Sequence, residues 1–487
     1  MLKSFRFISA LAFFCVTLTL ASVAQPTLPQ SKPGQYFDGW LKACSSGDLA
    51  QMTKWMTDSL SERALQRDPA ENRAKDDIAE CTQSGGYRLV EIQKSDEKSI
   101  EGIVVGQKMN DYNRLMYALN EQGKIDRGIF FPANPPEATL PKDLSDAALA
   151  QEIKANVEQV ARSGAFSGIV EVARGSKLIV SATGGYANTA KKSPITGSSQ
   201  FTLGSMGKMF TATAIGQLVD QKKMSFDDTV GKFFPEYANQ TVRDKVTVGM
   251  LLSHRSGMGD FLSKRTPEMM KNGVKRAAEF VPLYEKDEPK FAPGTSWAYS
   301  NAGLALAGAI VEKISGEAYP DYLRKHIFAP AGMTNSDPNN IPYSGAKMVT
   351  PYTKFTESGP AKDWSEAEHD IGSPAGGAIS TADDLIKFAD ALRNGKLVSK
   401  GTFGEMIKAH ADTPFGDKYG YAMEIHDVYG RTLVGHGGGF PGVSTHLYML
   451  LDSPYTIVVL ANQDPPADLK GGIKPVALVV EKAKQGK

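Results

Sequence analysis

A proline-rich segment at residues 133–141 divides this chain into two parts of unequal length. Proline rings are excluded from helix interiors and from central strands, so the segment reads as a connection. The chain has 487 residues, which is long for a single domain. We therefore predict a small domain at residues 25–132, a linker at residues 133–143 and a larger domain at residues 144–487.

The first residues have the pattern of an export signal. Lys3 and Arg6 precede a largely apolar run, and the small residues Ser22 and Ala24 follow it. We expect a signal peptide at residues 1–24 and a secreted or periplasmic protein, with an uncleaved anchor as the alternative. No later stretch is long and apolar enough to cross a membrane, so no stable span is expected after cleavage.

Three cysteines are present, and one of them, Cys15, lies in the predicted signal peptide. The remaining pair, Cys44 and Cys81, would reach an oxidising compartment. A disulfide between them is the favoured interpretation, and two buried free thiols are the alternative.

The small domain has a helical pattern followed by alternating apolar runs. Apolar residues recur at helical spacing up to residue 60, and strand-like runs follow at residues 87–92, 100–107, 112–119 and 124–131. This order of elements resembles the small ketosteroid-isomerase-like cone. No acid or base placed in an apolar pocket can be identified, so an accessory module is predicted, with a ligand of its own as the alternative.

The larger domain combines elements from both ends of its sequence. A helix at residues 147–163 and a hairpin at residues 166–183 open it, and several helical stretches follow. Strand-like runs return at residues 432–434, 445–451 and 455–461, before a closing helix at residues 476–484. We predict one α+β unit whose sheet joins distant parts of the chain.

A serine with a lysine three residues later occurs three times, at Ser95, Ser205 and Ser344. Only Ser205 opens a long apolar helix, which places the amine of Lys208 one turn away on the same face. Free backbone N–H groups at a helix start favour a developing anion beside the serine oxygen. The alternative is that Ser205 only caps the helix and Lys208 lies on the surface.

A Tyr-x-Asn triplet begins at Tyr299 and also at Tyr186 and Tyr237, which we assign to a sheet edge and to the surface. Tyr299 differs because a Pro-Gly turn precedes it and an apolar helix follows it. A phenol held near the serine–lysine pair could transfer a proton to a leaving group. Asn301 could hold a substrate amide or the lysine.

A glycine-rich run at residues 435–442 follows a strand-like segment. Glycines let a backbone N–H approach a substrate carbonyl closely. His-Gly-Gly-Gly also marks the oxyanion loop of some lipases, where it precedes a Gly-x-Ser-x-Gly elbow. This chain has no such elbow, so a lipase of that fold is excluded.

In this order, the serine–lysine, Tyr-x-Asn and His-Gly-Gly motifs resemble the class C β-lactamase-like branch of the penicillin-recognising serine hydrolases. The stretches at residues 251–258 and 373–377 are also similar to that family. The branch includes esterases and D-amino-acid peptidases. The resemblance implies a β-lactamase/transpeptidase-like domain, with an antiparallel sheet flanked by helices and a helical lobe beside it.

The resemblance also implies roles for individual residues. Ser205 would be the acylated nucleophile, Lys208 the general base, and Tyr299 a partner base and later acid. Asn301 would contact substrate or the lysine. The backbone N–H groups of Ser205 and Gly439 would form the oxyanion hole.

The residues His436, Gly437 and Gly438 would bind substrate in this family. True β-lactamases and carboxypeptidases usually carry Lys-Thr-Gly there, so this chain lacks an ammonium and a hydroxyl suited to a substrate carboxylate. The departure favours an esterase or a peptidase acting on a less anionic substrate. A weak β-lactamase is the alternative.

Composition and motifs exclude several other classes. The net charge of +1 provides no basic field for nucleic acid. No His-Glu-x-x-His or Cys-x-x-Cys motif occurs, and we expect neither metal nor cofactor, with the histidines structural. The main hypothesis is a serine hydrolase with a small-molecule or peptide substrate, and a catalytically silent binding protein is the alternative. No feature indicates an oligomeric state.

Overall fold

The computed structural model describes residues 26–266, 268–269, 274–339, 347–354, 361–364 and 373–485. The predicted signal peptide and Ser344 lie outside the described residues. Along the described part of the chain, no helix combines the length and apolar character needed to cross a membrane.

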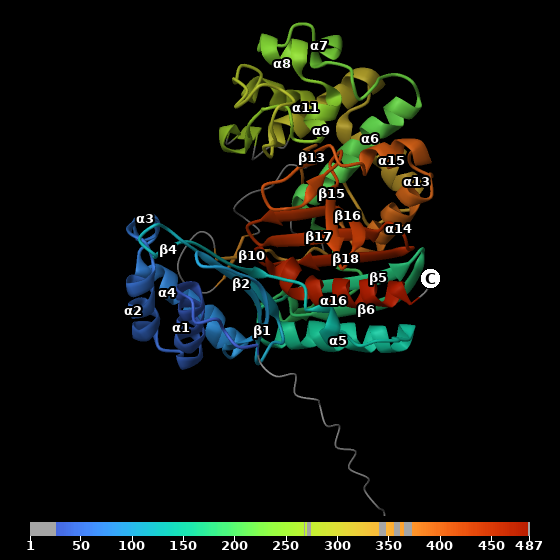
Figure 1. Ribbon diagram of the computed structural model, residues 1–487. Coiled ribbons are helices and arrows are strands. Elements are labelled where there is room, and N and C mark those ends of the chain that lie inside the picture. The colour runs from blue at the N-terminus through green and yellow to red at the C-terminus, as the bar shows by residue number, and fades with distance from the viewer. Residues whose placement is uncertain are drawn as a thin grey trace, which may run out of the picture.

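Residues 26–132 form helices followed by a four-stranded antiparallel sheet in the order β1-β2-β3-β4 (Figure 1). Phe37, Trp40 and Met52 from the helices pack against apolar strand residues in one core. The strands agree closely with those predicted, whereas the last two helices were not predicted. The elements are α1 (Lys32–Ser46), α2 (Leu49–Ser59), α3 (Glu62–Arg67), α4 (Ala70–Ser84), β1 (Tyr87–Ser95), β2 (Ser99–Gly106), β3 (Tyr112–Leu119) and β4 (Ile125–Pro132).

A disulfide joins Cys44 in α1 to Cys81 in α4. The predicted pairing is therefore confirmed. Because α2 and α3 lie between these two helices in the sequence, the bond links the first helix of the small unit to its last helix.

The centre of the larger unit is an eight-stranded antiparallel sheet, counted over the described residues. Its two segments meet where β5 pairs with β18, so strands from the two ends of the unit lie side by side. This confirms the predicted sheet built from distant segments. In spatial order the strands are β13 (Ala411–Asp412), β14 (Lys418–Tyr419), β15 (Glu424–Val428), β16 (Arg431–Phe440), β17 (Val443–Leu450), β18 (Tyr455–Ala461), β5 (Gly168–Arg174) and β6 (Lys177–Gly184).

Helices cover both faces of this sheet (Figure 1). Ile457 and Val459 of β18 point into the core under α5 (Asp146–Arg162) and α16 (Ala467–Lys484). The alternate residues Val458 and Leu460 point into the opposite core, shared with α6 (Lys208–Asp220) and α14 (Ala382–Arg393). A strand buried on both faces reads as a continuous apolar run, which explains the sequence of β18.

A helical lobe lies at one end of the sheet, at the top of Figure 1. Its central helix α11 (Asn301–Ser315) is buried over most of its length, and Ser300 caps it by accepting from the N–H of Gly303. The other helices of this part of the chain are α7 (Val230–Phe233), α8 (Gln240–Lys245), α9 (Val248–Leu252), α12 (Tyr319–Leu323), the π-helical η5 (Arg324–Phe328), α13 (Ala329–Ala331) and α15 (Lys400–Met406). Because lobe and sheet residues share one core, the lobe is held rigidly against the sheet.

Short elements complete the fold. Besides β13 and β14, the two-residue and three-residue strands are β7 (Tyr186–Asn188), β8 (Ser193–Pro194), β9 (Phe201–Thr202), β10 (Tyr352–Thr353), β11 (Lys362–Asp363) and β12 (Ile379–Ser380). The 3-10 turns are η1 (Glu137–Thr139), η2 (Gly204–Gly207), η3 (Leu262–Lys264) and η4 (Ala277–Leu283).

The small unit contacts the larger one through apolar and polar groups, and its Met109 packs in the core beneath α5 and α16. Lys470 in α16 lies 2.8 Å from the carboxylate of Glu80 in α4, and Gln159 in α5 donates to the carbonyl of Lys108. Leu140, inside the predicted linker, packs into the core beneath α5 and α16. The predicted linker segment is therefore attached to the larger unit.

Candidate active site

Ser205 and Lys208 lie where the turn η2 runs into helix α6. The amine of Lys208 donates to Ser205 Oγ over 3.0 Å, and the lysine side chain is fully buried. Gly204 has a left-handed backbone, with φ of 56°, which glycine adopts at little cost. The alternative of a surface lysine is therefore wrong.

Two further groups accept hydrogen bonds from the Lys208 amine. Asn301 Oδ1 accepts over 2.8 Å, and the carbonyl oxygen of Ala375 also accepts. The ring centroid of Tyr299 lies 4.7 Å from the amine. These contacts hold the buried amine beside Ser205, between Asn301 at the start of α11 and the backbone of Ala375.

Tyr299 lies in the loop directly before α11 and hydrogen-bonds with Ser205. Tyr299 as a whole residue is 37% exposed, so substrate can approach it. Removal of the hydroxyl from water raises the pKa of Tyr299 above its usual value, an effect that the Ser205 hydrogen bond opposes. At neutral pH the phenol is therefore protonated and able to donate.

Asn301 is held from both ends of its amide. Its oxygen faces Lys208, and its nitrogen donates to Asp260 Oδ2 over 2.5 Å. Asp260 could not be identified from the sequence, because a single carboxylate far away in the chain forms no motif with Asn301.

A directed chain of hydrogen bonds connects this loop to β16. The N–H of Ser300 donates to His254 Nδ1 over 3.1 Å, so the neutral ring carries its proton on Nε2 and donates to Tyr419 Oη over 3.0 Å. Tyr419 then donates to His436 Nε2 over 2.7 Å, and His436 Nδ1 donates to the Gly437 carbonyl. One choice of tautomers satisfies all four bonds.

Burial keeps both imidazoles of this hydrogen-bond chain, those of His254 and His436, uncharged. It lowers the pKa of His436 to about 4, against the opposing effect of Glu424, and holds the pKa of His254 well below its usual range. His254 was expected to be structural, and here it positions the Tyr299–Asn301 loop. Tyr419 was not singled out in the sequence, since it has no motif around it.

The glycines after His436 belong to strand β16 and not to a loop. A Cβ atom on Gly438 would lie 1.9 Å from the carbonyl oxygen of Leu203, and one on Gly204 would lie 3.2 Å from the N of Gly439. The β16 backbone therefore passes directly against the turn that carries Ser205. Thr445 Oγ1 supports this approach by donating to the Leu203 carbonyl over 2.8 Å.

The competing motif copies lie elsewhere. Ser95 is exposed at the end of β1, and Tyr186 is exposed at the edge strand β7, as predicted. Tyr237, predicted to lie on the surface, is only 2% exposed and packs in the core, so that assignment was wrong.

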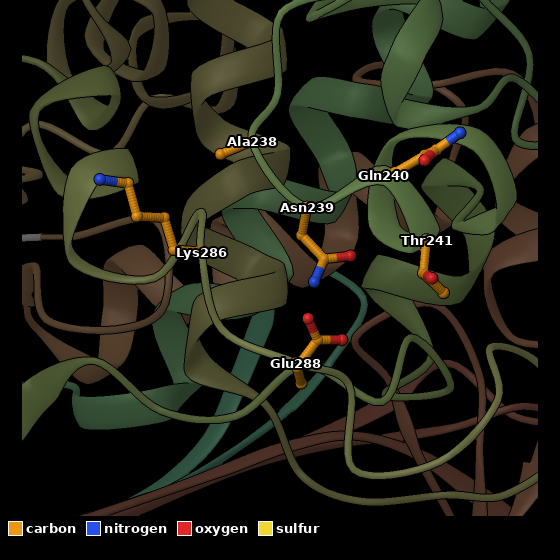
Figure 2. Close-up of a pocket in the computed structure, with 6 residues that line it drawn as sticks. All are labelled: Ala238, Asn239, Gln240, Thr241, Lys286 and Glu288. Atoms are coloured by element: carbon orange, nitrogen blue, oxygen red, sulfur yellow. The ribbon is translucent and has the colours of Figure 1, made fainter.

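Two other cavities lie outside the serine–lysine pair. Figure 2 shows a surface pocket of about 220 Å³ lined by residues such as Asn239, Lys286 and Glu288, with Asn239 and Glu288 pointing toward one another. Asn239 already caps α8 by accepting from the N–H of Val242. Its polar atoms therefore serve the fold.

The second cavity, of about 360 Å³, lies in the small unit and is lined partly by Trp40 and Tyr117. Trp40 Nε1 donates to Asp77 Oδ2 over 2.7 Å, and burial raises the pKa of Asp77 to about 6. An acid in an apolar pocket was not predicted here, because Asp77 lies in a polar stretch of α4.

A sheet covered by helices, with a serine and a buried lysine at the start of a helix beside a glycine strand, defines the class of β-lactamase-related serine hydrolases. Residues 149–481 match the family described as Beta-lactamase. The matched region makes up well over half of the chain. The chain therefore belongs to this family, which confirms the resemblance and the predicted fold class.

Individual relatives cover the same region. Penicillin-binding protein 4* of Bacillus subtilis is 28% identical over 331 residues, which make up 64% of this chain and 71% of that protein. The D-aminopeptidase of Brucella anthropi is 23% identical over 64% of this chain and 57% of its own length. The D-amino acid amidase of Ochrobactrum anthropi SV3 is 25% identical, with a TM-score of 0.59 over 69% of this chain and 99% of that structure.

Proposed function

We propose that this protein is an exported serine hydrolase that cleaves an ester, an amide or a D-amino-acid peptide through an acyl-enzyme. The observation that carries the proposal is the buried Lys208 amine 3.0 Å from Ser205 Oγ. Related chains described as D-aminopeptidase and D-amino acid amidase support the substrate class.

Acylation begins when Ser205 Oγ attacks the substrate carbonyl carbon. Its proton passes to Lys208 in the neutral form, whose two N–H groups would donate to Asn301 Oδ1 and the Ala375 carbonyl while its lone pair accepts from the Ser205 hydroxyl 3.0 Å away. The resulting oxyanion is stabilised by the backbone N–H groups of Ser205 and Gly439. The tetrahedral intermediate collapses as Tyr299 gives its proton to the leaving alcohol or amine, and Lys208 reprotonates the phenol.

Deacylation uses the same groups in reverse order. A water molecule attacks the acyl carbon while its proton passes to the Tyr299–Lys208 pair. The C–O bond to Ser205 then breaks, the acid product leaves, and the serine oxygen recovers a proton. The Ser205 hydroxyl, the Tyr299 phenol and the Lys208 amine thus return to their starting states.

Substrate selection follows from His436. Its ring is uncharged and engaged with Tyr419 and the Gly437 carbonyl, so it offers no cation to a substrate carboxylate. A substrate with an uncharged group at this position, such as an ester or an amide without a terminal carboxylate, suits the site better than a β-lactam. Export is supported by the Cys44–Cys81 disulfide, since such bonds persist in oxidising compartments.

The test replaces Ser205 by alanine and compares turnover of short-chain esters, D-amino-acid amides and β-lactams by the purified chain. Loss of such a nucleophile lowers turnover by about a millionfold. Ser95→Ala is the matched control, because Ser95 heads an exposed copy of the same motif.

A fluorophosphonate probe separates the hydrolase from the catalytically silent alternative. An activated Ser205 forms a covalent adduct that adds the mass of the probe in the parent protein and not in Ser205→Ala. Parent-like ester hydrolysis by Ser205→Ala would show that the nucleophile is another group, and absence of labelling in the parent would favour a binding protein.

A further inference from the structure

A cluster of two histidines and one glutamate lies on the central sheet and has no part in the proposed reaction. Glu424 and His426 are two residues apart on β15, so their side chains leave the same face of the strand. His446 comes from β17, on the other side of β16. The side chains meet over Gly437, where a Cβ atom would lie only 3.0 Å from His446 Nδ1.

The three side chains converge on a single point. His446 Nε2 lies 3.2 Å and His426 Nε2 lies 3.4 Å from the same carboxylate oxygen, Glu424 Oε2. One ligand atom from each residue can be chosen so that all lie within 4.8 Å of one another. Ligands about 2.0–2.1 Å from a tetrahedral zinc ion are about 3.3 Å apart, which the two shorter separations match.

The hydrogen bonding of these atoms is incomplete. Both Nε2 atoms are buried, and within the described part of the chain neither makes a hydrogen bond of acceptable geometry, although Glu424 Oε2 is near. An imidazole N–H that merely paired with a carboxylate would point along the line to its oxygen. The approaches of 3.4 Å from His426 Nε2 and 3.2 Å from His446 Nε2 to Glu424 Oε2 do not have that geometry.

The other ring nitrogens face carboxylates. His426 Nδ1 lies 3.0 Å from Asp417 Oδ1, and His446 Nδ1 lies 3.5 Å from Asp468 Oδ2. Asp468 is itself fixed by Ser444, whose hydroxyl donates to it over 2.5 Å. A carboxylate on the far nitrogen is the usual outer partner of a metal-binding histidine, because it fixes the tautomer with Nε2 free.

We propose that Glu424, His426 and His446 bind one divalent transition-metal ion of the zinc class. Two imidazole nitrogens and one carboxylate oxygen form a donor set that zinc accepts, with a fourth position left for water. The side chains of Glu424 and His426 are 25% and 20% exposed, so an ion can enter from solvent. This site departs from the expectation of no metal, which rested on short sequence motifs.

The bound ion would link β15 to β17 across β16. Glu424 Oε2 also accepts from the N–H of Gly437 over 3.1 Å, so the ion would stiffen the strand that carries the proposed oxyanion donor Gly439. The ion has no step in the hydrolysis. The proposal therefore stands or falls independently of the acyl-enzyme reaction.

The test uses the purified full-length chain without a histidine tag, stripped with a chelator and dialysed. Zinc is titrated by calorimetry and cobalt by visible absorption. We expect one ion per chain, the absorption bands of tetrahedral cobalt and a higher melting temperature with zinc. We expect His426→Asn and Glu424→Gln to lose binding, and Asp417→Asn to weaken it by about 10- to 100-fold.

His410→Asn is the matched control, because His410 stacks on Tyr421 outside the cluster, and it should bind zinc as the parent does. Circular dichroism verifies that each variant is folded. The absence of saturable zinc and cobalt binding by the folded parent would overturn the proposal, and so would unchanged binding by both His426→Asn and Glu424→Gln. Those results would leave protonated histidines paired with Glu424.

Discussion

The side-chain oxygen of Asn301 lies 2.8 Å from the amine of Lys208, and the same amide donates its nitrogen to Asp260. An ionised carboxylate has no proton to donate, so Asp260 must accept from the amide nitrogen of Asn301. The amide oxygen is therefore the end that faces the lysine. Asn301 therefore presents an oxygen, and not a second donor, to the amine beside Ser205.

Replacing Asn301 by alanine should lower kcat by about 100-fold, because a misplaced catalytic group costs about that much. KM should change little, which steady-state kinetics with an ester substrate would reveal. Asp260→Asn should lower kcat by a smaller factor than Asn301→Ala, since an amide at position 260 can still accept from Asn301. A parent-like kcat for Asn301→Ala would mean that the amine is positioned by Ser205 and Ala375 alone.

Replacing Tyr419 by phenylalanine should destabilise the fold by about 1–3 kcal/mol, because the Nε2 atoms of His254 and His436 lose their shared partner while buried. Chemical denaturation measures the free energy of unfolding. Tyr429→Phe, which removes a hydroxyl bonded only to the Pro135 carbonyl among the described contacts, serves as comparison. Equal losses in the two variants would contradict a special role for the His254–Tyr419–His436 chain.

Replacing Gly438 by alanine should cost about 1–3 kcal/mol, the usual range for overpacking, because the new Cβ would lie 1.9 Å from the Leu203 carbonyl. The strand would also be pushed from the Ser205 turn, so kcat should fall as well. Gly404→Ala is the matched control: it lies in α15 with open space around it, and alanine favours helices. A Gly438→Ala protein as stable as Gly404→Ala would show that β16 is free to move.

Glu171 in β5 should make stability fall as pH rises. It is 2% exposed and accepts from Ser181, and burial raises the pKa of its carboxyl to about 7. Between about pH 4.5 and 7 the unfolded carboxyl ionises while the folded one keeps its proton. The free energy of unfolding therefore falls by up to about 3 kcal/mol over this range, and the loss is complete above about pH 7.

Glu171→Gln should remove this loss, so its advantage over the parent should grow from near zero below pH 4.5 to its full value above pH 7. Unfolding free energies measured at pH 4, 6 and 8 would show the difference. Glu158→Gln, on the exposed side of α5, should follow the parent at every pH. A parent and a Glu171→Gln variant with parallel pH profiles would contradict a raised pKa.

Much of the fold could be predicted because local signals agree with it. The strands β1 to β4 and β18 lie where alternating or continuous apolar runs indicated them, and α5 was predicted to within one residue at either end. The family could be recognised because Ser205, Tyr299 and His436 begin short motifs in a fixed order. The structure brings Ser205, Lys208, Tyr299 and Asn301 together, while their catalytic roles and the domain boundaries stay predictions.

The rest depends on residues that meet only after folding. Asp260 reaches Asn301, and Tyr419 joins two histidines, across long stretches of chain that leave no periodic signal. The strand-like run was predicted only for residues 432–434, because glycine is rare in strands, yet β16 continues through the glycines to Phe440, where Gly438 must approach Leu203. A residue-by-residue propensity cannot express such a requirement.

The pairing of β5 with β18 also affects when the protein can fold. A chain delivered from its N-terminus, by the ribosome or through a translocation channel, presents β5 long before its neighbour β18 is made. The eight-stranded sheet cannot be completed until residue 461 has emerged. Assembly of the Ser205 site is thereby postponed to the last stage of synthesis, so a truncated nascent chain does not carry a finished site.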